Sequence, residues 1–128
     1  MDNYPIALFG EAEKGDFGTA YLLQSLSQAA DYLGNPPGES KGLLCAIQSL
    51  LYRRDLLFFR VKEEGFSYTD YFYGLKLLEK QEGRIQLSAI CLPGLGNPEI
   101  IREAVSLCHT FKIIMITNEP DLYDYLTF

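Results

Sequence analysis

The sequence is poor in basic side chains. Its 11 Lys and Arg residues stand against 17 Asp and Glu residues, which gives a formal net charge of −6. Because long-range electrostatics then repel polyanions, we expect neither nucleic acid nor an anionic membrane as a partner. No apolar run approaches the roughly 18 residues that span a bilayer, and the first residues lack the basic and apolar regions of a signal peptide. The sequence therefore predicts a cytoplasmic protein.

Groups for metal or thiol chemistry are also scarce. His109 is the only histidine, which excludes a histidine-rich metal site, and the ring is expected to cap the end of its helix. The three cysteines, Cys45, Cys91 and Cys108, are scattered through apolar segments, an odd set typical of reduced, buried thiols. The residues identify no catalytic group, no metal site and no cofactor, and they leave open whether any reaction is catalysed.

The residues that are present predict a single α/β domain over residues 1–128. Hydrophobic residues make up 48% of the chain, enough to bury one core. Short apolar runs alternate with helical patterns, which predicts right-handed crossovers and a mainly parallel sheet in a three-layer, Rossmann-like domain. We expect about four strands, at residues 6–9, 56–61, 85–92 and 113–117.

Helices are expected between these strands. Apolar residues at helical spacing predict the first helix over residues 17–33, ended by Gly34. Ser40 is expected to cap the second helix. Asn97 as a cap, followed by Pro98, is a strong start for a further helix.

The segment 63–83 has two interpretations. Its aromatic stretch, residues 66–73, either forms a strand that returns against residues 56–61 or belongs to an irregular piece that leads into a helix. We favour a short extended piece followed by a helix through Leu75 and Leu78.

A binding site is expected at the carboxyl edge of the sheet. Parallel strands direct their C-terminal loops to one edge, where backbone N–H groups and helix N-termini gather. Three loops supply the predicted ligand-binding residues, which are Gly10, Glu11, Gly15 and Asp16 after the first strand, Gly94, Gly96 and Asn97 after the third, and Thr117 and Asn118 after the last.

The first of these loops is acidic. Residues 10–15 have the glycine spacing of a phosphate-binding loop, but Asp16 and Phe17 stand where that loop needs Lys and Ser or Thr. Glu11, Glu13 and Asp16 would repel a phosphate, and we interpret them as solvated loop charges in preference to a magnesium site. A phosphate-bearing ligand is therefore expected to need a divalent ion, or else the ligand is neutral or cationic.

The order of the segments resembles one family, the cytokinin-activating phosphoribohydrolases once described as lysine decarboxylases. Residues 6–10 look like the first strand of that family, and residues 42–47 (GLLCAI) are similar to its helix-opening motif Gly-Leu-Met-x-Ala-Val. Residues 92–97 (LPGLGN) resemble a shortened form of its Pro-Gly-Gly-x-Gly-Thr turn. The residues similar to the tyrosine-bearing segment after the family's last strand are Asn118, Tyr123, Asp124 and Leu126.

This resemblance implies a nucleotide pocket without hydrolase activity. The phosphate turn lacks its second glycine and its threonine, and Glu99 comes two residues too early to align with the family's catalytic glutamate. The family's catalytic arginine would fall near Lys76 and Leu77.

Two functions follow from these patterns. The first is a Rossmann-like domain that binds a small molecule, with a nucleotide as the class that the resemblance implies. The second is an interaction or homo-oligomerisation module whose aromatic side chains form a surface for a partner. The same rings fit a role in completing the core equally well. The residues concerned are Tyr68, Tyr71, Phe72 and Tyr73, with Tyr123, Tyr125 and Phe128.

Overall fold

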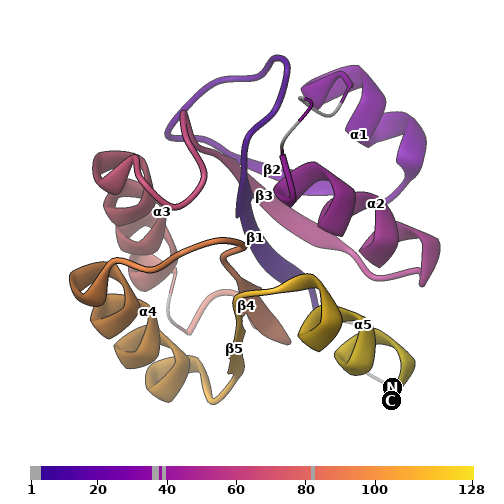
Figure 1. Ribbon diagram of the computed structural model, residues 1–128. Coiled ribbons are helices and arrows are strands. Elements are labelled where there is room, and N and C mark those ends of the chain that lie inside the picture. The colour runs from indigo at the N-terminus through magenta and orange to yellow at the C-terminus, as the bar shows by residue number, and fades with distance from the viewer. Residues whose placement is uncertain (1–3, 36–37, 39, 82) are drawn as a thin grey trace.

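The strands form one five-stranded sheet in the order β2-β3-β1-β4-β5 (Figure 1). The computed structural model describes residues 4–35, 38, 40–81 and 83–128. Four strands are parallel and β2 is antiparallel to its neighbour β3. The strands are β1 (Ile6–Gly10), β2 (Ala20–Leu23), β3 (Leu56–Arg60), β4 (Ala89–Cys91) and β5 (Ile114–Ile116).

Helices cover both faces of this sheet. Helices α1, α2 and α5 lie on one face, and α3 and α4 lie on the other (Figure 1). Their bounds are α1 (Leu26–Leu33), α2 (Gly42–Leu51), α3 (Tyr68–Lys80), α4 (Pro98–Phe111) and α5 (Glu119–Thr127). The three-layer, Rossmann-like α/β architecture is confirmed. Within the described ranges, no helix is long and apolar enough to cross a membrane.

The strand β1 lies at the centre of the core. All five of its residues are buried. Ile6 and Leu8 belong to the apolar cluster under α1, α2 and α5, while Ala7 and Phe9 belong to the cluster under α3 and α4. A parallel strand that is covered on both faces is apolar at every position. For this reason the run Ile6–Gly10 forms a strand without alternating with polar residues. All four predicted strands lie in this one sheet.

The predicted helix over residues 17–33 is wrong in its first half. Ala20–Leu23 is the strand β2, and only Leu26–Leu33 is helical. In β2, Leu23 is fully buried whereas Leu22 is 50% exposed, which is the alternation of a strand with one covered face. The free edge of β3 supplies the hydrogen-bonding partner that favours a strand here. Ser25 then caps α1 by accepting a hydrogen bond from the backbone N–H of Gln28.

Two further boundaries differ from expectation. The third predicted strand, residues 85–92, is shortened to Ala89–Cys91 because a turn precedes it. Gly83 has φ of 81° in that turn, and the N–H of Ile85 donates to the carbonyl of Gln81. The aromatic stretch 66–73 is not extended, because α3 already begins at Tyr68.

Of the two predicted helix caps, one is confirmed and the other is wrong. Asn97 caps α4 as predicted, accepting hydrogen bonds of 3.0 Å from the N–H groups of Glu99 and Ile100. Ser40 does not cap α2: the residue at the cap position is Lys41, which makes no side-chain capping bond. The Ser40 hydroxyl instead donates a hydrogen bond to the carboxylate of Glu64.

Candidate functional site

The carboxyl ends of the parallel strands meet at one edge of the sheet, as predicted (Figure 1). There the N–H of Gly94 donates to the carbonyl of Thr117 at 3.2 Å, which joins the loops after β4 and β5. A Cβ built on Gly65 would lie 2.6 Å from the carbonyl oxygen of Gly94, so the loops after β3 and β4 are in direct contact. Gly10 ends β1 beside them.

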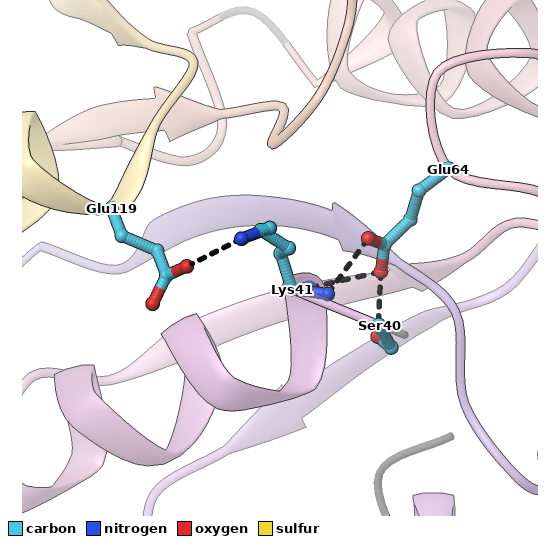
Figure 2. A network of polar contacts seen from close by, with 5 residues as sticks. Ser40, Lys41, Glu64 and Glu119 are labelled. Atoms are coloured by element: carbon cyan, nitrogen blue, oxygen red, sulfur yellow. Dashed lines mark hydrogen bonds and ion pairs between the residues drawn. The ribbon is translucent and has the colours of Figure 1, made fainter. Parts of the chain in front are cut away.

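Glu64 occupies the centre of this edge, and the sequence analysis did not anticipate it. Its Oε2 accepts hydrogen bonds from the Ser40 hydroxyl at 2.7 Å and from the backbone N–H groups of Glu11 at 2.8 Å and Gly42 at 2.9 Å. Its Oε1 accepts from the backbone N–H of Lys41 at 2.9 Å (Figure 2). The carboxylate therefore satisfies donors at the N-terminus of α2, where the helix dipole favours a negative charge.

The contact between Glu64 and the first loop is reciprocal. Glu11 Oε2 accepts a hydrogen bond of 2.9 Å from the backbone N–H of Glu64. Each glutamate thus uses its carboxylate to bind the backbone of the other. Two backbone groups that would otherwise be unsatisfied are paired in this way.

Two glycines allow this close arrangement. A Cβ on Gly42 would lie 2.5 Å from the Cα of Gly10 and 2.7 Å from Glu64 Oε2. Only hydrogen fits in that space. The pair places the start of α2 directly against the end of β1, within reach of Glu64.

An ion pair joins the start of α2 to the start of α5. Lys41 Nζ lies 3.2 Å from Glu119 Oε1 (Figure 2). The side chains are 62% and 40% exposed, so solvent screens the pair and its contribution to stability is small.

The predicted residues Gly15 and Asp16 make their contacts with other elements. The N–H groups of Glu13 and Lys14 donate to the carbonyl of Leu33, which folds this part of the loop onto the end of α1. The N–H of Asp16 donates to the Tyr21 hydroxyl at 2.6 Å. The carbonyl of Gly15 accepts from Arg60 at 2.5 Å.

The loop carboxylates do not converge. The Glu11 carboxylate accepts a hydrogen bond from the backbone N–H of Glu64, and Glu13 Oε1 accepts a hydrogen bond of 3.0 Å from the N–H of Asn35. Across the part of the chain that the structure describes, no group of three or more His, Cys, Asp or Glu residues is arranged to hold a metal ion.

An open cleft lies beside Glu64, between the loops after β3 and β4. We call it the edge cleft, and it has a volume of about 340 Å³. Phe66, 65% exposed, and Tyr68, 47% exposed, form its aromatic wall. The lining contains no Lys or Arg side chain. Its residues are Gly65, Phe66, Tyr68, Gly94, Gly96, Asn97 and Pro98.

The loop that carries Phe66 is anchored to α3 by hydrogen bonds. The N–H of Gly65 donates to the hydroxyl of Tyr71 at 2.8 Å, and the N–H of Lys62 donates to Asp70 Oδ2 at 2.9 Å. Tyr71 is fully buried, and this burial raises its pKa to about 12. The backbone of the loop is therefore fixed while the ring of Phe66 faces solvent.

The predicted aromatic residues do not form one surface. Tyr71 is buried against Phe9, at 5.6 Å between ring centroids, so its assignment to a surface is wrong. Tyr125 is half-buried under the guanidinium of Arg54. Tyr73 is exposed and lies next to Gly18. The remaining rings are Tyr68 in the edge cleft, the half-buried Phe72, and the exposed Tyr123 and Phe128.

The cysteines are unpaired and buried, as predicted. The neighbouring thiol of Cys45 and burial together raise the pKa of Cys91 far above its ordinary value. Burial raises the pKa of Cys108 to about 11. Cys91 and Cys108 are therefore protonated near neutral pH, and neither is an activated nucleophile.

The sequence contained only an indirect signal for Glu64 and Phe66. Both follow β3 in a loop at the carboxyl edge, the same position that led to the prediction for Gly10, Gly94 and Thr117. Their chemistry could not be recognised locally, since the partners of Glu64 lie 22 to 53 residues earlier in the chain.

No protein-family model, curated protein or solved structure matches this chain.

Proposed function

We propose that this domain binds a small molecule with a flat aromatic or heterocyclic ring in the edge cleft. The observation that carries the proposal is the exposed aromatic wall of Phe66 and Tyr68 beside the backbone of Gly94 and Gly96. Exposed rings on an anchored loop offer stacking surface, and nearby backbone groups offer hydrogen bonds to a ring edge.

The charges around the cleft favour a neutral or cationic ligand over a phosphate. The carboxylate of Glu64 already binds the N–H groups at the start of α2, which a phosphate would otherwise use. Asn97 likewise satisfies the first N–H groups of α4, and Glu99 adds a negative charge in that turn. A phosphate would have to displace one of these acceptors or approach a cleft whose lining has no cation.

A nucleoside is the ligand class best suited to these conditions. It presents a flat heterocycle for Phe66 and Tyr68 and carries no negative charge. The resemblance of residues 42–47 and 92–97 to the phosphoribohydrolases implies a nucleotide, and it supports the base and sugar of this ligand but not the phosphate. The proposal is for binding and includes no hydrolysis.

Thermal unfolding tests this proposal. The chain is heated with each of the four common ribonucleosides, with their 5′-monophosphates, and with each monophosphate plus Mg²⁺. We expect at least one nucleoside to raise the Tm, since a ligand at 100 times its Kd adds about 2.7 kcal/mol. Its monophosphate should bind no better than the nucleoside, with or without Mg²⁺.

A pair of variants localises the binding. Phe66→Ala should abolish the Tm shift without lowering the Tm of the free protein by more than a few degrees. Tyr73→Ala, which removes an exposed ring of α3 that lies outside the edge cleft, should leave the shift unchanged. A shift that survives Phe66→Ala, or tighter binding of monophosphates than of nucleosides, would refute the proposal.

A further inference from the structure

The outer face of α2 lacks the charges that a solvent-facing helix normally carries. Residues 42–52 include no Asp, Glu, Lys or Arg, whereas each of the other helices has at least one. Leu44 is 48% exposed and Leu51 is 64% exposed, and the half-buried Ile47 and Gln48 lie between them. This spacing of i, i+3, i+4 and i+7 forms one continuous stripe. A helix that is apolar all round is normally covered.

Two aromatic rings extend this stripe. Tyr52 follows α2 and is 43% exposed, and Tyr123 on α5 is 49% exposed. Their rings meet edge to face with centroids 6.4 Å apart. We call the whole surface the α2 face. It consists of Leu44, Ile47, Gln48, Leu51, Tyr52 and Tyr123.

We propose that the α2 face is the contact between two copies of this chain, related by a two-fold axis that sets their α2 helices antiparallel. The protein has a net charge of −6, so two copies repel each other over most of their surfaces. The stripe is free of charge and avoids that repulsion. It is also self-complementary, because the same residues face each other across a two-fold axis.

Charges at the two ends of α2 match this antiparallel arrangement. Arg53 is exposed just beyond the C-terminal end of α2. At the other end, the Lys41–Glu119 ion pair places the start of α5 beside the start of α2, and the exposed Asp121 lies in that first turn of α5. A two-fold axis through the middle of α2 brings Arg53 of one copy towards Asp121 of the second copy, and the reverse pair forms at the other end.

Sedimentation of the 128-residue chain tests the proposal. We expect a species with twice the monomer mass of 14.5 kDa at protein concentrations on the order of 100 µM. Leu44→Glu and Leu51→Glu should each return the protein to its monomer mass. Leu22→Glu is the matched control, because Leu22 is 50% exposed on an edge strand, β2, outside the α2 face. This variant should stay dimeric. Circular dichroism establishes that each variant is folded.

Two cysteine variants and a charge exchange test the geometry. Gln48→Cys lies at the middle of the stripe, so the two introduced thiols should form an intermolecular disulfide with copper–phenanthroline as oxidant. Tyr32→Cys, at an exposed position of α1, should not. Arg53→Glu should weaken the dimer several-fold, and adding Asp121→Arg should restore it.

The outcomes separate this proposal from its alternatives. A monomeric parent protein would overturn it, as would dissociation by Leu22→Glu together with persistence in Leu44→Glu and Leu51→Glu, which would place the contact on β2. Cross-linking through Tyr32→Cys but not Gln48→Cys would overturn the two-fold axis through α2.

Discussion

The carboxylate of Glu64 lies 2.9 Å from the backbone nitrogen of Gly42, 22 residues earlier in the chain. This contact joins the loop after β3 to the helix on the opposite side of the carboxyl edge. Because the same carboxylate accepts hydrogen bonds from Glu11, Ser40 and Lys41, it joins its own loop to two other segments, the loop after β1 and the start of α2.

Removal of the Glu64 carboxylate is expected to destabilise the fold. Glu64→Ala leaves several part-buried donors unpaired, and we expect a loss of about 3 kcal/mol in the free energy of unfolding. Glu64→Gln retains acceptor capacity at one oxygen and should cost less, about 1–2 kcal/mol. Urea denaturation measures both. The exposed neighbour Glu63 provides the control, since Glu63→Gln should change stability by no more than about 0.5 kcal/mol.

Gly42 and Gly38 should respond oppositely to alanine. At Gly42 an added Cβ would lie 2.5 Å from the Cα of Gly10, so α2 must move and stability should fall by about 3 kcal/mol or more. At Gly38 a Cβ meets nothing within 4 Å. There alanine should be neutral or stabilise by about 0.4–1 kcal/mol, because it restricts the unfolded chain. Thermal and urea unfolding measure both variants. If Gly42→Ala and Gly38→Ala changed stability by the same amount, the close packing at Gly42 would be contradicted.

The thiols should be unreactive in the folded protein. The raised pKa values of Cys91 and Cys108 leave little thiolate at pH 8, and burial also blocks the reagent. An aromatic disulfide reagent should therefore detect almost no thiol in the native protein and three in denaturant without reductant. Rapid reaction of the native protein would contradict this arrangement, and fewer than three thiols after denaturation would indicate a disulfide.

Stability should fall in alkaline solution through Tyr71. Its pKa is about 12 in the folded protein and 10.0 as an isolated group. Between these values the unfolded chain loses the proton while the folded protein keeps it, so the free energy of unfolding decreases as pH rises. The full stability is present below pH 10 and the total loss is about 2–3 kcal/mol by pH 12. Tyr71→Phe should be less stable at pH 8 but should lack this part of the pH dependence in urea titrations.

Local patterns were sufficient where one segment contains the whole signal. The apolar run Ile6–Gly10 predicts a buried strand, and Asn97 with Pro98 predicts the start of α4. The positions of Gly94 and Thr117 at one edge follow from parallel strands alone.

The pattern failed where a distant segment decides between two local structures. Leu22, Leu23 and Leu26 fit helical spacing, but pairing of Leu22 with Leu57 and of Leu23 with Leu56 makes the first two part of a strand. Whether β3 has a free edge cannot be read from residues 17–33. Tyr71 shows the same limit, because its burial depends on Phe9 and on the loop at Gly65.

The sequence by itself determined the α/β class, the four parallel strands, the buried thiols and the edge at which loops gather. These depend on hydrophobic periodicity, capping residues and charge balance, all of which act over a few residues or over the whole composition. Only the tertiary structure decided that Glu64 binds the start of α2, that the carbonyl of Gly15 accepts a hydrogen bond from Arg60, and that Phe66 faces an open cleft. Each depends on segments that are far apart in the chain, and their hydrogen bonds form only after the sheet has closed the distance between them.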